Sequence, residues 1–420
     1  MDRLRFGAFT APHHPLGESP TLLFRRDIAL AAQLDELGYD EYWVGEHHSS
    51  GWETIGSPEL LLAACAERTH TIRLGTGVIS LPYHHPFNVA QRLAQLDHQS
   101  RGRLIFGSGP GALPSDAHTL GIDPLVQRDR QDEAMGVIFR LLRGDERFSY
   151  ECDWFTLRDA QLQILPVQEN MEAATASSLS PSGMQLAGKH STGVLSIAST
   201  SSDGLAALPT QWAFAEASAA KHGKTVSRKN WRVLMSWHIA ETREQARNEA
   251  LLGLHRWHNE YNVHVLGRPG SVRVEDPWVL LDQVAGAPGG PAGASVVGTP
   301  DDLVAAIRRL YEITGGFGVV VGFAHDWANA EATRRSWDLV ARYVIPEING
   351  QLRNLRGSAD FLVSKQAELM GRASKAVLAK IAETPGAMDA LQVTIAERAA
   401  APAGEFRPGA DVSAAAASAD

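Results

Sequence analysis

The chain has 420 residues, 44% of them hydrophobic and 21% charged, with a formal net charge of −9. This acidic balance excludes a broad electrostatic affinity for nucleic acid or anionic membranes. Only Cys65 and Cys152 are present, which excludes a disulfide framework or a thiolate metal cluster. No run approaches the roughly 18 apolar residues of a membrane span, and the N-terminus lacks the apolar core of a signal peptide. We therefore expect a cytoplasmic protein with no nucleic-acid or membrane partner.

Strand-like and helix-like segments alternate along the chain. Helical patterns follow the first four strand-like runs, at residues 22–37, 58–69, 86–99 and 128–143. The strand-like runs, rich in β-branched and aromatic residues, are 4–10, 41–46, 72–80, 103–109, 171–178, 193–199, 231–240 and 317–323. Eight strands with helices between them predict an α/β fold, a (β/α)8 TIM barrel. The alternative is an open doubly wound sheet, but the first strand–helix turn lacks that fold's GxGxxG fingerprint.

Some segments depart from the repeat. Residues 148–170 are expected to form an inserted strand hairpin, and 257–300 a second insertion that contains the Pro/Gly-rich run 287–294. We expect residues 283–297 to lack regular structure and to form a mobile lid over the site. The expected organisation is a barrel over 1–350, a helical C-terminal extension over 351–398 and a disordered tail over 399–420.

The sequence GEHH, residues 45–48, follows the apolar run 42–44, so its polar side chains stand at the C-terminal end of a buried strand. Ligands collect at that edge of parallel sheets and barrels. Glu46 and His47 are therefore candidate catalytic residues, although an acid–imidazole pair can also serve only to satisfy a loop.

Paired histidines also occur at 13–14 and 84–85, but they do not indicate a metal site. Neighbouring side chains on an extended segment point in opposite directions, and no His-x-His or His-x3-His chelate recurs at the strand ends. No metal is expected.

Two further strand ends are rich in glycine and serine: GSGPG at 107–111 and SSLSPSG at 177–183. The serines lead into a helix, so hydroxyls and free helix N–H groups converge on one point, as a phosphate requires. Each cluster alone is ambiguous, since glycines allow close packing and Ser180 before Pro181 can be a simple helix cap. Together they indicate a phosphorylated cofactor across the barrel mouth.

The segments DEYWVGEHH, LGTGVISLPYHHP, LDHQSRGRLIFGSGPG, SSLSPSG and VVGTPDDLVAAIRRL occur in the order and spacing of a known family. Over residues 1–348 the chain resembles the bacterial-luciferase-like flavin monooxygenases. The run from PYHHP onward is most similar to the branch of limonene monooxygenases and actinobacterial natural-product oxygenases. The resemblance implies a TIM barrel that receives reduced flavin from a separate reductase and reacts it with O2.

The resemblance also implies roles for individual residues. His47 matches the histidine that protects the C4a-peroxyflavin and serves as acid or base, and an imidazole suits that proton chemistry. Gly77–Val78 matches a non-prolyl cis peptide under the flavin ring, and Asn88 is a candidate contact to the ring edge, with helix capping as its alternative. The cofactor-binding set expected on this basis is Gly77, Val78, Asn88, Gly109, Gly111, Ser178 and Ser180.

One departure from the family concerns the phosphate. Pro110 stands where luciferase has a phosphate-binding arginine, so the phosphate must be held by backbone groups, Ser178, Ser180 or a basic residue elsewhere. This departure leaves FMN and FAD both open.

The expected activity is that of a two-component monooxygenase that uses reduced FMN or FAD and O2. It would hydroxylate or epoxidise a small apolar compound, such as a terpene or polyketide-like molecule, with Baeyer–Villiger insertion as second choice. Its expected partners are an NAD(P)H:flavin reductase and a second copy of the chain in a homodimer. Two alternatives remain open, an F420-dependent oxidoreductase and a non-catalytic flavin-binding subunit.

Overall fold

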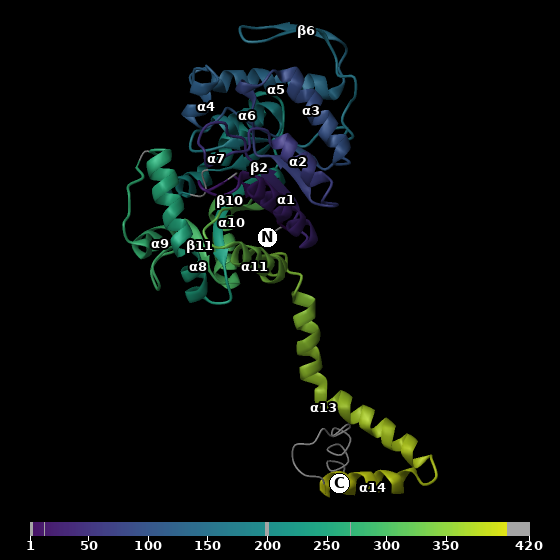
Figure 1. The fold of residues 1–420 in the computed structure, drawn as a ribbon. Coiled ribbons are helices and arrows are strands. Elements are labelled where there is room, and N and C mark those ends of the chain that lie inside the picture. Colours follow the sequence, from purple (N-terminus) through teal and green to yellow (C-terminus); the bar gives the residue numbers. More distant parts are fainter. Residues whose placement is uncertain (1–2, 12, 198–200, 269, 401–420) are drawn as a thin grey trace. The chain divides into compact units, whose positions relative to one another are not determined.

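The computed structural model describes residues 3–11, 13–197, 201–268 and 270–400 (Figure 1). Its centre is a closed barrel of eight parallel strands, because β1 pairs with both β2 and β12, and β10 pairs with both β9 and β12. In barrel order the strands are β1 (Arg5–Thr10), β2 (Glu41–Val44), β3 (Arg73–Thr76), β5 (Leu104–Gly109), β8 (Ala173–Ser177), β9 (Gly193–Ser196), β10 (Trp231–Ile239) and β12 (Val319–Ala324). The predicted TIM barrel is confirmed, and the open sheet is excluded.

Helices enclose the barrel (Figure 1). The four helices predicted in the first half correspond to α1, α2, α3 and α5, and the proline at the first position of α2 fixes its start as predicted. The helices of the barrel unit are α1 (Pro20–Glu36), α2 (Pro58–Ala66), η1 (Leu81–Tyr83), α3 (Pro86–Gln99), α4 (Pro114–Thr119), α5 (Gln127–Arg143), α6 (Ser182–His190), α7 (Ser202–Lys221), η3 (Arg228–Asn230), α8 (Arg243–Arg256), η4 (Trp257–Val265), α9 (Pro277–Ala285), α10 (Pro300–Thr314), α11 (Ala330–Leu339), η5 (Val340–Val344) and α12 (Ile345–Ile348).

The inside of the barrel is filled by side chains. A cluster built only from strand residues and Ala11 centres on Trp43, which is fully buried. A Cβ at Gly75 would overlap the Trp43 ring, so this glycine makes room for the indole. Because the interior is packed, ligands can reach the barrel only at its ends.

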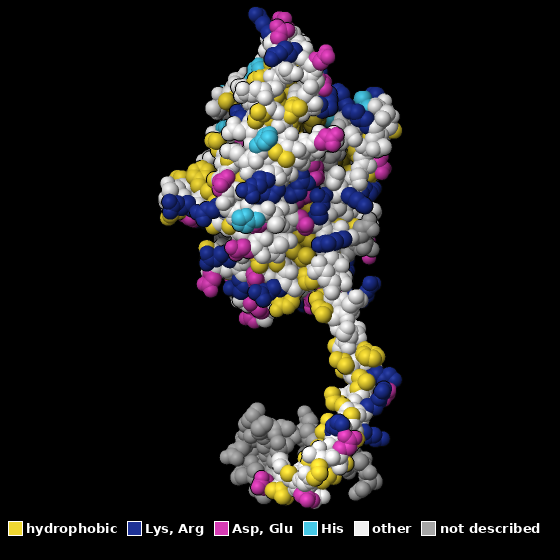
Figure 2. Space-filling model, turned by 90° about the vertical axis from the view of Figure 1, so that its right-hand side faces the viewer, with side chains coloured by type: hydrophobic (Ala, Val, Ile, Leu, Met, Phe, Trp, Pro, Cys, Tyr) yellow, Lys and Arg dark blue, Asp and Glu magenta, His cyan; other side chains and the backbone are white. Residues whose placement is uncertain are grey.

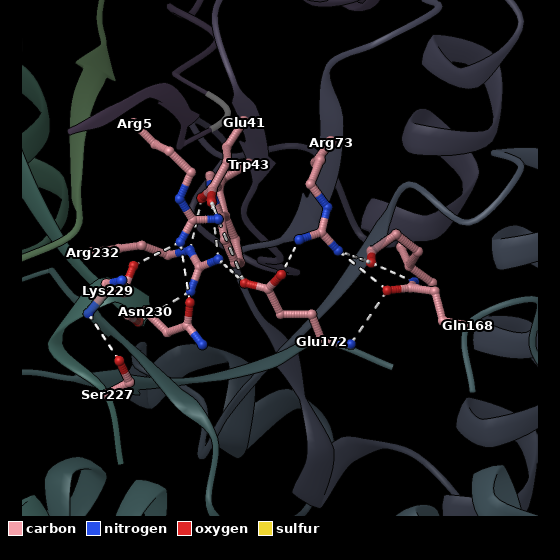
Figure 3. Close-up of polar contacts among 11 residues, drawn as sticks. Arg5, Glu41, Trp43, Arg73, Gln168, Glu172, Ser227, Lys229, Asn230 and Arg232 are labelled. Carbon is pink, nitrogen blue, oxygen red and sulfur yellow. Dashed lines mark hydrogen bonds and ion pairs between the residues drawn. The ribbon is translucent and has the colours of Figure 1, made fainter. Parts of the chain in front are cut away.

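Ionic side chains close the N-terminal end of the barrel (Figure 3). Arg232 of β10 makes a two-point pair with Glu41 at the start of β2, at 2.7 and 2.9 Å. Arg5 lies 3.0 Å from Glu41, and Glu172 joins Arg232 to Arg73. These contacts lie at the end of the barrel opposite to the predicted site.

The structure differs from the predicted elements in three places. The predicted strand 72–80 is divided into β3 and β4 (Ile79–Ser80), which flank the peptide bond Gly77–Val78. A further strand, β11 (Ser295–Gly298), pairs with the end of β10 and was not predicted. The prediction that residues 283–297 lack regular structure is wrong at both ends, because α9 continues to Ala285 and β11 begins at Ser295. The lid role of this segment stays a prediction. The predicted hairpin insertion is present as β6 (Phe148–Glu151) and β7 (Thr156–Ala160).

The chain divides into two compact units, Met1–Asn349 and Gly350–Asp420. The second contains α13 (Arg353–Ala382) and α14 (Ala387–Ala400), and hydrophobic side chains such as Phe361 and Met370 are exposed along it (Figure 2). Of the tail predicted to be disordered, 399–420, residues 401–420 lie outside the described residues. Among the helices described, none is both long and apolar enough to cross a membrane.

Candidate active site

His47 lies between two acidic side chains just beyond the C-terminal end of β2. Its Nδ1 is 3.1 Å from Asp116 Oδ2, and its Nε2 is 3.5 Å from Glu53 Oε2. Asp116 comes from α4, and Glu53 from the loop that follows GEHH. Burial lowers the pKa of His47, but the Glu53 and Asp116 carboxylates outweigh burial and raise the pKa above its usual value.

Asp116 also orders the loop around His47. Its Oδ1 accepts hydrogen bonds from the His48 backbone N–H at 3.0 Å and from the Ser49 hydroxyl. Burial would raise the pKa of Asp116, but these bonds and the contact with His47 lower it. Asp116 therefore remains an ionised acceptor beside the imidazole.

Glu46 is turned away from His47 and joins three other groups. Its Oε1 accepts from His48 Nε2 at 2.8 Å and from His84 Nε2 at 2.7 Å, and its Oε2 accepts from the Ser80 N–H at 3.0 Å. Burial would raise the pKa of Glu46, but the bonds from His48 and His84 hold it at about 2. Glu46 thus ties the GEHH segment to the segment after β4.

The same three side chains, Glu46, His48 and His84, form a group that could in principle hold a cation. However, both imidazole nitrogens are at hydrogen-bonding distance from the same carboxylate oxygen. Hydrogen bonding within the triad accounts for this geometry without a metal.

The peptide bond Gly77–Val78 is cis, as the resemblance implies. A Cβ at Gly77 would overlap the Phe9 ring, and a Cβ at Gly109 would overlap the Val78 side chain. The two glycines thus bring β1, the β3–β4 junction and β5 into close contact at the mouth. Phe9 in turn stacks on Phe323 of β12, with ring centroids 5.9 Å apart.

Gly111 and the start of α5 connect the glycine-rich loop to the serine-rich one. Gly111 has a φ of +91°, and a Cβ there would overlap the hydroxyl of Tyr83, which accepts a hydrogen bond from Gln127. The next residue on α5, Arg128, directs its Nε to Ser182 Oγ at 3.4 Å. A guanidinium therefore stands at the N-terminus of α6.

Ser178 and Ser180 lie between β8 and α6. Ser180 Oγ donates to Ser182 Oγ at 3.1 Å and accepts from the Ser182 N–H at 3.3 Å, while Ser178 is exposed. Pro181, the N-cap of α6, provides no side-chain cap. Hydroxyls, helix N–H groups and Arg128 form a donor set that suits a phosphate.

Asn88 makes its side-chain hydrogen bond within α3. It is exposed in the first turn of α3, and its Oδ1 accepts a hydrogen bond from Gln91 in the same helix, at 3.3 Å. This contact is within the helix and does not connect Asn88 to the mouth.

A nine-residue π-helix, η4, lies against the His47 side of the mouth. Its Tyr261 stacks on Trp52 at a ring separation of 5.3 Å and meets His13 edge-on at 5.4 Å. The Tyr261 hydroxyl, Trp52 Nε1 and Glu53 Oε2 are buried and have no hydrogen-bond partner among the described residues. Such a concentration of unsatisfied polar atoms, next to a rare type of helix, is typical of a functional site.

With this geometry in place, comparison with known proteins assigns the family. The family model for luciferase-like monooxygenases matches residues 4–316. The chain belongs to this family. Across 381 residues it is 46% identical to 4-hydroxyprotoasukamycin monooxygenase of Streptomyces nodosus subsp. asukaensis, an alignment that covers 89% of this chain and all of that protein. Across 358 residues it is 45% identical to limonene 1,2-monooxygenase of Rhodococcus erythropolis, covering 84% and 89% of the two chains.

A solved structure agrees with this assignment. The oxygenating constituent of 3,6-diketocamphane monooxygenase from Pseudomonas putida is a type II Baeyer–Villiger enzyme in complex with FMN. It superposes with a TM-score of 0.68 at 26% identity, over 82% of this chain and 99% of that chain. The predicted family, fold and monooxygenase class are confirmed.

Several residues at the site were missed in the sequence. Asp116 lies just after the GSGPG loop, in the first turn of a short helix. Its place beyond the end of a barrel strand is the signal that could have predicted it as a site residue. Arg128 lies in the first turn of the next long helix, α5. This position could have predicted it as the replacement for the arginine that is absent at position 110. Glu53 and Tyr261 carry no sequence signal, since only the folding of a loop and of η4 brings them together.

Proposed function

We propose that the chain is the oxygenase component of a two-component, flavin-dependent monooxygenase that uses reduced FMN and O2. The observation that carries the proposal is a juxtaposition at the mouth of this family's barrel. A protonatable imidazole, His47, and a phosphate-type donor set at the start of α6 stand at the same edge. The relatives named for limonene and for 4-hydroxyprotoasukamycin support oxygenation of organic compounds.

The chemistry of the donor set fits FMN. Arg128, Ser178, Ser180, Ser182 and the N–H groups of α6 would hold the phosphate, with Arg128 serving in place of the arginine absent at position 110. A short anion-binding cradle of this kind suits a terminal phosphate, and we therefore favour FMN over FAD.

The flavin ring would lie over Gly77–Val78, which the resemblance assigns to this role. Gly109 supports this segment, because its missing side chain allows Val78 to pack against β5. Phe9 and Phe323 would provide apolar walls beside the ring. Asn88 remains a candidate for the ring edge only if its side chain leaves Gln91.

Bound reduced flavin supplies two electrons and activates O2, so that one oxygen atom enters the substrate and the other leaves as water. The overall reaction is reduced FMN plus O2 plus substrate giving FMN, oxygenated substrate and water. The protein contributes proton transfer at the His47 imidazole, which is oriented by Asp116, and exclusion of water by η4. Glu46 would act indirectly, by fixing the GEHH segment.

The aromatic side chains near the mouth favour an apolar substrate, such as a terpene or polyketide-like compound. Hydroxylation or epoxidation is our first assignment, and Baeyer–Villiger insertion is the second. Because no GxGxxG fingerprint for a dinucleotide is present in the sequence, electrons from NAD(P)H would arrive through a separate reductase. We also propose that the chain forms a homodimer.

The test combines the purified chain with a flavin reductase, NADH, FMN, 18O2 and limonene as a probe terpene. We expect a product that carries one 18O atom, formed only when the reductase is present. Rapid NADH oxidation by the chain alone, or turnover with reduced F420 and none with reduced FMN, would contradict the proposal.

A further inference from the structure

Both ring nitrogens of His47 face a carboxylate. Asp116 lies 3.1 Å from Nδ1, and Glu53 lies 3.5 Å from Nε2. The two acidic side chains are 1% and 6% exposed. A neutral imidazole carries a proton on only one of its nitrogens, so only the imidazolium can donate to both acids at once.

The two carboxylates differ in their other partners. Asp116 is also satisfied by the His48 N–H and the Ser49 hydroxyl. By contrast, Glu53 Oε2 has no hydrogen-bond partner among the described residues. A buried carboxylate without a partner is strongly unfavourable, so Glu53 needs the proton on His47 Nε2 more than Asp116 needs the one on Nδ1.

The other imidazole near Glu53 cannot provide this proton. His13 Nε2 lies 3.8 Å from Glu53 Oε1, but it accepts a hydrogen bond from Trp257 Nε1 at 3.3 Å. Burial first, and then the positive charge of Arg268, lower the pKa of His13 to about 3. His13 is therefore neutral, and its contact with Glu53 is no ion pair.

We propose that Glu53 is a positioning residue that keeps His47 doubly protonated in the resting enzyme, so that His47 enters the reaction as a proton donor. The geometry that carries this is the placement of an otherwise unpaired, buried carboxylate at Nε2, opposite the Asp116 contact at Nδ1. Only the donor role in turnover rests on the proposed function.

The other charged groups around His47 act in both directions. Glu46 adds a third negative charge and raises the pKa of His47. His13 is neutral, whereas Glu46 raises the pKa of His48, so a positive charge on His48 opposes the one on His47. The three carboxylates outweigh this opposition. Tyr261 faces Glu53 from η4. Burial, then the Glu53 charge and the side-chain contact with Glu53, raise the pKa of its phenol. The phenol therefore stays neutral, and it offers Glu53 a polar contact but no positive charge.

The test is a histidine titration by NMR on the full chain, labelled with 13C,15N-histidine and free of flavin. The His47 signals are assigned by their absence in His47→Gln. In the wild type we expect imidazolium shifts at pH 7 and a midpoint above the usual value of about 6.5. In Glu53→Gln the midpoint should fall by about one pH unit or more, whereas Glu53→Asp should recover part of the shift.

The matched control is Glu249→Gln, which breaks another imidazole–carboxylate pair, that of Glu249 with His238 at 2.9 Å. It should leave the His47 midpoint unchanged. In turnover, product yield per NADH should fall as the pH rises through the His47 midpoint, and in Glu53→Gln this alkaline limb should move to lower pH together with the NMR midpoint.

A wild-type His47 that titrates at or below about 6.5, or a midpoint that Glu53→Gln does not move, would overturn the inference. If Glu53→Gln fails to fold, the His47 midpoints measured in the wild type and in Glu53→Asp still test the inference. A raised midpoint without any oxygenation would leave the role of Glu53 in the protonation of His47 standing and would contradict the proposed function instead.

Discussion

Arg232 and Glu41 form a two-point ion pair that is completely buried at the N-terminal end of the barrel, with Nε–Oε2 and Nη2–Oε1 distances of 2.7 and 2.9 Å. Arg232 belongs to β10 and Glu41 to β2, so the pair joins strands on different sides of the barrel. The candidate active site lies at the other end. The ion pair that stabilises the barrel and the candidate active site thus lie at opposite ends of the barrel.

Glu41→Gln should therefore destabilise the protein by about 3–5 kcal/mol, since it leaves the Arg232 charge buried without its main partner. Urea unfolding at pH 7 measures this loss. The control Arg243→Gln removes a pair with Asp302 on the surface, where Arg243 is 74% exposed, and should leave the urea midpoint unchanged. Equal unfolding curves for wild type and Glu41→Gln would show that the Glu41–Arg232 pair does not stabilise the fold.

Arg128→Ala should weaken FMN binding by about 10- to 100-fold, the effect expected for one charged hydrogen bond. Riboflavin lacks the phosphate, so its binding should not change. Flavin fluorescence titration measures both affinities. The control Arg130→Ala, two residues along α5, removes a contact with Trp154 and should leave FMN binding intact. An equal loss of FMN and riboflavin affinity would rule out a phosphate contact.

His47→Ala should reduce product formation by about 10²–10⁴-fold, as expected on removal of a general acid–base group, without loss of the folded state. The O2 consumed should then appear as hydrogen peroxide. Product and peroxide yields per NADH, together with circular dichroism, measure this effect. His190→Ala removes an imidazole paired with Asp132 away from the mouth and serves as the control. Unchanged coupling in His47→Ala would show that the residue is only structural.

Gly109→Ala should destabilise the chain by about 1–3 kcal/mol and impair flavin binding, because the added methyl group overlaps Val78 beside the cis peptide. Thermal unfolding and FMN titration measure the two effects. Gly136→Ala is the matched control, since nothing stands near its Cβ on α5, and alanine there should stabilise the helix by about 1 kcal/mol. Equal melting temperatures and equal FMN affinities in the two variants would contradict this prediction.

The low pKa of Glu46 predicts how the stability of the protein depends on pH below neutrality. Its pKa is about 2 in the folded chain and about 4.5 ordinarily, so the ionised group stabilises the fold above about pH 4.5, and this contribution is lost as the pH falls towards 2. The difference in unfolding free energy between wild type and Glu46→Gln should be constant near neutrality and shrink between about pH 4.5 and 2. A difference independent of pH would show that Glu46 is not held as a carboxylate.

The barrel and the order of its strands could be predicted because strands buried on both faces form continuous apolar runs, such as 41–46 and 103–109. Their ends then place Glu46, His47 and Gly109 at one edge of the barrel. The short strand β11 could not be predicted, since its four residues SVVG follow a Pro/Gly-rich run and gain their pairing only from the end of β10.

The residues that complete the site were harder to predict from the sequence. Glu53 and Tyr261 come from an irregular loop and a π-helix, and only tertiary packing brings them to His47. Glu46 and His47 were both predicted to be catalytic because they stand together at the end of one strand. Alternation along an extended segment instead directs Glu46 to His48 and His84, and leaves Glu53 and Asp116 for His47.

The claim that this barrel binds reduced FMN and governs its reaction with O2 is tested most directly by stopped-flow absorbance. Photoreduced FMN is mixed anaerobically with the chain and then with oxygenated buffer, and reoxidation is followed in the flavin band. The account predicts reoxidation that differs from that of free FMN and saturates with protein concentration. A trace that superimposes on that of free FMN at the highest protein concentration would contradict it.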